Sequence, residues 1–228
     1  MKIAFILFIC YLLGSIPFGL VWVKIFTGKD IREIASGRTG GTNAMRAGGF
    51  WVGFLTGLMD IFKGFATYWV VMAFGINDPW VRVIAALMAI IGHNYSIFLM
   101  YRDETGKLKL RGGAGGATAL GGTLALSVTV GLIVWPLSIL VFLFIGYASV
   151  TTLSIAFFST LIFLIRVLVK ASGAEWAYVI YGLLAGLLLV YALRPNLKRL
   201  REGTERVVGL RAARMKKKQE KTPSSDSE

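Results

Sequence analysis

The chain has 228 residues, of which 56% are hydrophobic and 16% charged, and its mean hydropathy is +0.68. These values exclude an ordinary soluble domain and predict an all-α, polytopic integral membrane protein, because several apolar runs reach the roughly 20 residues that cross a bilayer. The net charge of +13 lies in short loops and in the C-terminal tail, which favours a surface facing anionic lipids and argues against nucleic acid as a partner.

Apolar runs in chain order predict about seven transmembrane helices. The first contains Pro17 and lacks a small-residue cleavage site, so we interpret it as a retained span and not as a signal peptide. Residues 1–206 are expected to form one membrane domain. The basic tail, 207–228, is expected to be disordered, above all in its polar last dozen residues. The runs fall near 3–26, 51–76, 79–101, 114–127, 130–147, 149–169 and 174–193.

Basic residues predict the orientation of these helices. They gather in the loops 28–49 and 102–112 and in the tail after 193, which the positive-inside rule places in the cytoplasm, with the N-terminus outside. An even number of passes must then separate 112 from 194, so 113–147 should be two helices with a break near 127–131. Arg166 and Lys170 would flank an outer turn, against the rule, unless they snorkel.

Two glycine-rich segments, "SGRTGGTNAMR" at 36–46 and "LRGGAGGATALGG" at 110–122, have the composition of anion-binding loops. Glycines free backbone amides and let a ligand approach, a following helix N-terminus adds positive potential, and an arginine offers a fixed fork for phosphate oxygens. The alternatives are a helix cap for Ser36 or Thr42 and close helix packing for Gly115. Candidate phosphate-binding residues are Gly40, Gly41, Thr42, Asn43, Arg111, Gly112, Gly113 and Gly115.

Three ionisable residues lie inside apolar runs. Asp60 and Lys63 share one helix face and either neutralise each other or support the site. His93, the single histidine, is either a hydrogen-bonded packing residue or a catalytic proton acceptor. With Cys10 as the single cysteine, the chain cannot supply a zinc site of three or four His/Cys ligands, and we expect no metal and no cofactor.

Six segments together resemble the bacterial acyl-phosphate:glycerol-3-phosphate acyltransferases, the PlsY family. They are "LLGSIPFG" at 12–19, "SGRTGGTNAMR" at 36–46, "DIFKG" at 60–64, "GH" at 92–93, "RGGAGGATALG" at 111–121 and "NLKRLREGTER" at 196–206. The resemblance implies a seven-helix enzyme of the bacterial inner membrane with its active site facing the cytoplasm. It would move a fatty acyl group from acyl phosphate to the 1-hydroxyl of sn-glycerol 3-phosphate, the first step of phospholipid synthesis, and depend on an acyl-phosphate-forming enzyme.

The resemblance also implies roles for individual residues. Ser36 and Arg46 would be the essential pair of the first motif, the glycines after Arg111 would cradle phosphate, Asn196 would support activity and Glu205 the structure of the third motif. Acyl phosphate is already activated and the sequence shows no Ser-His-Asp motif. Ser36 is therefore expected to donate a hydrogen bond or orient a substrate, and catalysis to rest on positioning and charge stabilisation.

Several positions depart from the family pattern. Ala114 stands where the family has the second lysine of its glycine-rich motif, Arg38 replaces an asparagine, Gly41 an alanine and Leu193 a histidine. An insertion occupies 102–110. Arg38, Lys107 or Lys109 could supply the missing charge; alternatively the chain is a diverged, non-catalytic or altered-substrate member. A transporter of a small organic phosphate would predict two related halves, which the sequence does not show.

Overall fold

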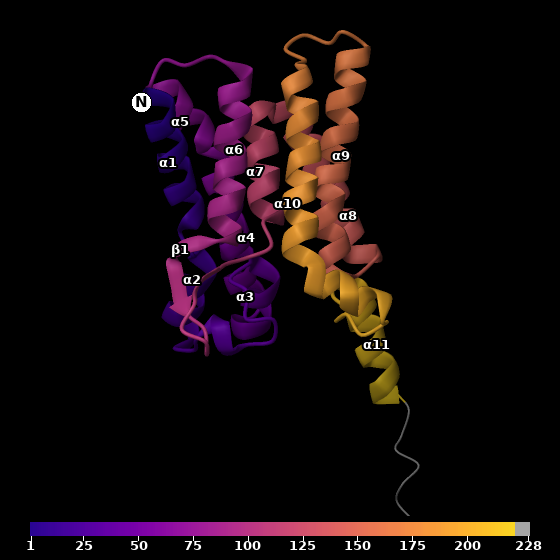
Figure 1. The fold of residues 1–228 in the computed structure, drawn as a ribbon. Helices are drawn as coiled ribbons and strands as arrows, with labels where there is room; N and C mark the ends of the chain where they lie inside the picture. Colours follow the sequence, from indigo (N-terminus) through magenta and orange to yellow (C-terminus); the bar gives the residue numbers. More distant parts are fainter. Residues whose placement is uncertain (222–228) are drawn as a thin grey trace, which may run out of the picture.

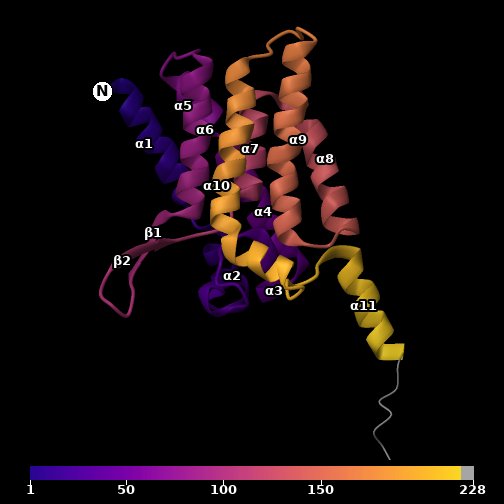
Figure 2. The same cartoon turned by 45° about the vertical axis from the view of Figure 1, so that its right-hand side comes forward.

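The computed structural model describes residues 1–221 as a bundle of helices that lie side by side (Figure 1). One end of the bundle carries the short helices Phe18–Thr27 and Gly41–Gly48, a β-hairpin and the C-terminal helix (Figures 1 and 2). The elements are α1 (Lys2–Ser15), α2 (Phe18–Thr27), a 3-10 turn (Ile31–Glu33), α3 (Gly41–Gly48), α4 (Phe50–Phe65), α5 (Thr67–Ala73), α6 (Pro79–Asn94), β1 (Ser96–Arg102), β2 (Leu108–Arg111), α7 (Gly116–Leu126), α8 (Val128–Phe144), α9 (Ala148–Leu168), α10 (Trp176–Arg201) and α11 (Gly209–Lys221).

The helices have the length and surface of a membrane protein. The α1–α2 segment, α9 and α10 are each long and apolar enough to cross a bilayer, while α7 and α8 are shorter apolar helices. Large apolar side chains such as Phe8, Phe157 and Leu187 are exposed on the outside of the bundle, where lipid would cover them. The predicted all-helical membrane class therefore fits, and the count of seven passes and their orientation stay predictions.

The predicted break inside 113–147 is confirmed. Helix α7 ends at Leu126 and α8 begins at Val128, and the residue between them, Ser127, has extended backbone angles. The Ser127 Oγ accepts a hydrogen bond from the Val130 amide at 3.4 Å, which caps α8.

The sequence analysis expected the third apolar run, 79–101, to be helical throughout, and this expectation is wrong for its last residues. Helix α6 stops at Asn94, and residues 96–102 form β1, which pairs antiparallel with β2. The apolar run "SIFLMY" has the aromatic and branched residues that suit a strand, and a short apolar run does not by itself distinguish strand from helix. The insertion at 102–110 supplies the turn and much of the second strand, so the run folds back as a hairpin.

Glycines allow two helix pairs to pack at backbone distance. A Cβ added to Gly92 of α6 would lie 2.2 Å from the Tyr11 carbonyl of α1. One added to Gly64 of α4 would lie 2.2 Å from the Thr118 carbonyl of α7, and one added to Gly121 2.0 Å from the Ile61 carbonyl. Small residues at these crossings are typical of membrane helices, and they fix α4, α6 and α7 around the site.

Residues 209–221 of the C-terminal tail, for which the sequence analysis expected disorder, form helix α11. Good helix formers dominate its first half, and Arg211 anchors it by donating to the Ile145 carbonyl at 3.4 Å and by lying over the Tyr147 ring. Residues 222–228, the last part of the expected disordered tail, lie outside the described residues.

Candidate active site

The first glycine-rich loop, residues 28–40, folds around the side chain of Asn43. The Asn43 Nδ2 donates to the carbonyls of Ile31, Ile34 and Arg38 at 3.3, 2.9 and 2.9 Å. The Asn43 Oδ1 accepts from the Ser36 amide at 3.5 Å. With its amide occupied within the loop and only 3% exposed, Asn43 positions the loop and does not fit the predicted role of direct phosphate donor.

Ser36 lies within this loop, and Arg46 follows it in α3. The Ser36 side chain is exposed, and its Oγ accepts from the Arg38 amide at 3.4 Å. Arg46 lies in the last turn of α3 with its side chain exposed. Both predicted catalytic residues are therefore open to a substrate that approaches the loop.

The start of α3 offers free backbone donors. Gly40 is the N-cap, and the amides of Gly41 and Thr42, the first helical residues, have no intrahelical partner. Gly41 also packs closely on α4, because a Cβ there would lie 3.0 Å from the Gly53 carbonyl. The glycine at 41 thus fits helix packing as well as anion binding.

The second glycine loop is built against His93. The Gly113 amide donates to the His93 carbonyl at 2.9 Å, so it is not free for an anion. A Cβ on Gly113 would lie 1.9 Å from His93 Nε2, and one on Gly112 would lie 2.1 Å from the His93 carbonyl. These two glycines permit close packing on His93, and their use as a backbone phosphate cradle stays a prediction.

The end of this loop retains the geometry of an anion site. Gly115 has φ +83° and is the N-cap of α7, and the amides of 116–118 have no intrahelical partner. A helix start with free amides attracts an anion. Arg111, at the other end of the loop, stacks on the Tyr101 ring at 3.8 Å, which fixes its guanidinium on the hairpin.

Asp60, Lys63 and His93 form a buried polar network. The Lys63 Nζ lies 2.9 Å and the His93 Nδ1 3.5 Å from the same Asp60 Oδ1, and all three side chains are at most 4% exposed. The Lys63 Nζ also donates to the Ile16 carbonyl at 3.0 Å, where the chain breaks between α1 and α2. The network joins α4 and α6 to the break between α1 and α2, which favours the structural interpretation of this pair.

The third motif is held by Glu205. The Glu205 Oε1 accepts from Asn196 Nδ2 at 3.1 Å and the Oε2 from Ser149 Oγ at 2.6 Å. The carboxylate is 7% exposed, while the Asn196 Oδ1 is buried without a hydrogen-bond partner in the described chain. Glu205 thus ties the end of α10 to the start of α9 and orients Asn196.

Four arginines share this end of the bundle. Burial lowers the pKa of Arg38, and the charge of Arg199 lowers it further. Partial burial also lowers the pKa of Arg46, together with Arg206 and Arg199, and Glu205 opposes them. Arginine stays protonated through such shifts, so these residues create a strongly positive region. We call Arg38, Arg46, Arg199 and Arg206 the cation cluster.

Asn94 is a candidate that the sequence analysis missed. It is 4% exposed, and both its Nδ2 and its Oδ1 lack a partner among the described residues. A Cβ on Gly115 would lie 2.6 Å from its Oδ1, so the amide faces the start of α7. A polar amide directly after His93 in an apolar run was the available signal.

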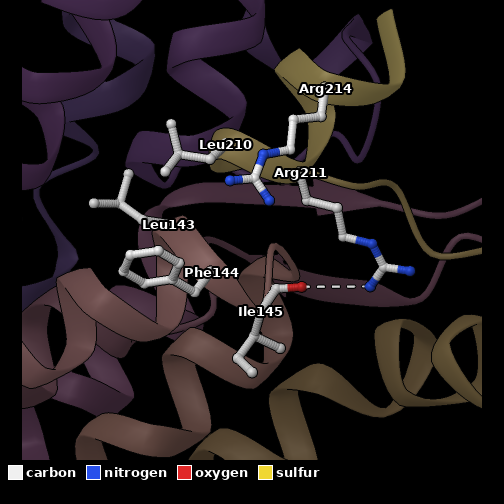
Figure 3. A pocket seen from close by; sticks show the side chains of 6 residues that line it. All are labelled: Leu143, Phe144, Ile145, Leu210, Arg211 and Arg214. Carbon is white, nitrogen blue, oxygen red and sulfur yellow. Dashed lines mark hydrogen bonds between the residues drawn. The ribbon is translucent and has the colours of Figure 1, made fainter. Parts of the chain in front are cut away.

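A surface cavity of about 370 Å³ lies elsewhere, between the end of α8 and α11 (Figure 3). Its walls are Leu143, Phe144, Ile145 and Leu210, with Arg211 and Arg214 beside them. None of the predicted site residues lines it. The chemistry that the motifs indicate is therefore in the region of the two glycine loops and the third motif.

That region can bind anions and stabilise developing negative charge. Two helix starts and the cation cluster provide donors, Ser36 provides a hydroxyl, and the adjoining helices provide an apolar wall.

Comparison with known proteins gives consistent matches along the chain. A family model described as glycerol-3-phosphate acyltransferase matches residues 4–203. A glycerol-3-phosphate acyltransferase of Thermus thermophilus is 38% identical over 208 residues, covering 90% of this chain and 95% of the relative.

Solved structures give the same picture. A crystal structure of PlsY, an integral membrane glycerol 3-phosphate acyltransferase, in its glycerol 3-phosphate form has a TM-score of 0.76 at 32% identity. The match covers 92% of this chain and 96% of that one. Its lysophosphatidic acid form has a TM-score of 0.73 at 31% identity and covers 92% and 97%.

Proposed function

Because this chain belongs to the glycerol-3-phosphate acyltransferase family, we propose that it moves a fatty acyl group from acyl phosphate to the 1-hydroxyl of sn-glycerol 3-phosphate. The products are lysophosphatidic acid and inorganic phosphate. The observation that carries this proposal is the cation cluster, set beside two glycine-rich loops at one end of an apolar helix bundle.

The charge balance of the site suits two phosphate-bearing substrates. The charge of Arg199 acts on both Arg38 and Arg46, and that of Arg206 acts on Arg46. The carboxylate that opposes them at Arg46 is Glu205, whose two oxygens are occupied by Ser149 and Asn196. Exposed guanidinium forks bind phosphate oxygens through paired, charge-assisted hydrogen bonds. We therefore assign Arg46 to a substrate phosphate.

We infer the acyl donor from the surroundings of Ser36, which in the described chain show no base that would activate its hydroxyl. The contacts of its Oγ within residues 1–221 are with the backbone of its own loop, and no base lies in hydrogen-bond contact with it. A direct transfer onto glycerol 3-phosphate needs a donor that already carries a good leaving group, and acyl phosphate is such a donor. An acyl-phosphate-forming enzyme must then supply it.

The transfer is a single displacement at the acyl carbon. The substrate hydroxyl oxygen forms a new bond to the carbonyl carbon, and the bond from that carbon to the phosphate oxygen breaks. Phosphate leaves with the electron pair, and a phosphate oxygen takes the hydroxyl proton. His93 is less suited to take it, because its Nδ1 faces Asp60 and its Nε2 faces Gly113; we assign it a positioning role.

Placement in the membrane brings the apolar acyl chain to this polar site. We propose seven passes: α1–α2, α4–α5, α6, α7, α8, α9 and α10, with the glycine loops on the cytoplasmic side of the bacterial inner membrane. Helix α7 has 11 residues and is about 16 Å long, roughly half the apolar thickness. The loop before it then reaches below the membrane surface, which is tolerated because Gly112, Gly113 and Gly115 are buried in protein.

The test is phosphate release and lysophosphatidic acid formation by the purified protein given acyl phosphate, with and without glycerol 3-phosphate. Product should require both substrates, and acyl-CoA should not replace acyl phosphate. Arg46→Ala should reduce transfer about 10- to 100-fold, since a charge-assisted phosphate contact is worth about 1.5–3 kcal/mol. Arg102→Ala, in the hairpin, serves as the matched control and should keep wild-type rates. Equal use of acyl-CoA, or an Arg46→Ala variant within about twofold of wild type, would contradict the assignment.

A further inference from the structure

Arg38 is an inward-facing cation without an acidic partner. Its Nη2 donates to the Ala192 carbonyl of α10, and its Nη1 is buried with no hydrogen-bond partner in the described chain. None of the ion pairs within residues 1–221 involves it. A buried charge is costly unless it is paired, so this partly buried guanidinium favours an anion that the described residues do not supply.

The charges around Arg38 also favour a bound anion. Burial and the charge of Arg199 lower the pKa of Arg38, whereas Tyr95 opposes them. A second positive charge close to a partly buried arginine is stabilised by a ligand of high negative charge, and a phosphate monoester is such a ligand.

The loop that carries Ala114 packs on His93, and the charge of Arg38 contributes to the electrostatic environment of the same imidazole. The loop that carries Ala114 rests on His93 through Gly113, whose amide donates to the His93 carbonyl. Ala114 therefore follows directly after the residue that touches the ring, and a lysine at 114 would bring its ammonium to the same region.

The two lysines of the hairpin do not compete for this role. The Lys109 Nζ lies 2.8 Å from Asp103 Oδ2, so its charge is already paired. Lys107 is exposed in the hairpin turn, and the hairpin extends away from the helices (Figure 2).

We propose that Arg38 binds a substrate phosphate in place of the lysine that this chain lacks at Ala114, so that the phosphate-binding cation has moved from the second glycine loop to the first. The inference rests on the proposed function. It concerns a phosphate monoester or acyl phosphate dianion, and the kinetics below distinguish the two substrates.

The experiment relocates the charge. Arg38→Asn should raise the KM for glycerol 3-phosphate or for acyl phosphate about 10- to 100-fold, the range of one hydrogen bond to a charged group. Adding Ala114→Lys to this variant should return that KM to within about threefold of wild type, since an ammonium is then restored. Arg38→Lys should give an intermediate KM because the fork geometry is lost. The double variant Lys107→Gln/Lys109→Gln is the matched control and should leave both KM values unchanged.

A purely structural role for Arg38 gives different results. If Arg38 only holds the first loop against α10, Arg38→Asn will lower the melting temperature without changing either KM, and adding Ala114→Lys will not restore the wild-type KM. Unchanged KM values in Arg38→Asn, or no rescue by Ala114→Lys, overturn the proposal. Should the wild type show no transfer, the proposed function fails, and calorimetric titrations with glycerol 3-phosphate and with acyl phosphate still decide. Equal affinity of wild type and Arg38→Asn for both ligands rejects the phosphate contact, and weaker binding of either ligand by the variant supports it.

Discussion

The buried pair Asp60–Lys63 allows a quantitative test of what holds the helices together behind the site. Its charged atoms lie 2.9 Å apart, and each side chain is 1% exposed. Replacing Lys63 by Met leaves the carboxylate with His93 at 3.5 Å as its remaining partner. Removal of one member of a buried ion pair typically costs about 3–5 kcal/mol, because the other charge stays buried without compensation.

Lys63→Met also removes the hydrogen bond to the Ile16 carbonyl, a further loss of about 1 kcal/mol. For a chain of this size, a loss of 3–5 kcal/mol lowers the melting temperature by roughly 6–20 °C. Asp60→Asn should show a similar fall. The double variant Asp60→Asn/Lys63→Met should lose about 2–3 kcal/mol less than the sum of the two single losses, because no unpaired charge remains.

The assay is thermal unfolding of the four proteins in one detergent, analysed as a double-mutant cycle. The exposed pair Lys198–Glu202, with charges 3.9 Å apart and side chains 77% and 49% exposed, is the control, and Lys198→Met/Glu202→Gln should give a coupling below about 1 kcal/mol. A Lys63→Met protein that melts within about 2 °C of wild type would refute the reasoning from burial.

Three further variants test the site. Gly113→Ala should destabilise the protein and abolish activity together, because the added methyl would lie 1.9 Å from His93 Nε2. Gly57→Ala, with open space around the added methyl, is the control and should be neutral. An active Gly113→Ala protein with an altered KM alone would contradict this packing role. Glu205→Gln should lower the melting temperature by weakening the contact of its Oε2 at 2.6 Å, by about 1–2 kcal/mol, and lower kcat through misplacement of the third motif; calorimetry and steady-state kinetics would show both, and unchanged values would reject that role. Asn94→Leu should keep or raise the melting temperature, since it removes a buried amide without partners, and raise the KM for glycerol 3-phosphate; a less stable variant with unchanged KM would show that the amide serves the fold.

Hydrophobic runs and charge placement in the sequence determined most of the helical layout. Runs of apolar residues are local signals, so the membrane class and the break at Ser127 followed from composition and from the parity of basic loops. The end of α6 could not be predicted from the sequence, because the apolar run "SIFLMY" suits a strand as well as a helix. Its pairing with residues 108–111 across the inserted turn is what makes it a strand.

The residues of the three motifs could also be identified from the sequence, but which of their polar atoms are bonded within the protein could not. Whether a backbone amide or side chain is free for a ligand depends on partners far along the chain. The Gly113 amide donates to the His93 carbonyl, and the Asn43 side chain donates to carbonyls of its own loop. The Nδ2 and Oδ1 of Asn94 have no partner within residues 1–221. Arg38 was one of three candidate replacements for the missing lysine, and we favour it because, among the described residues, its guanidinium contacts α10 but has no acidic partner and its Nη1 has no hydrogen-bond partner.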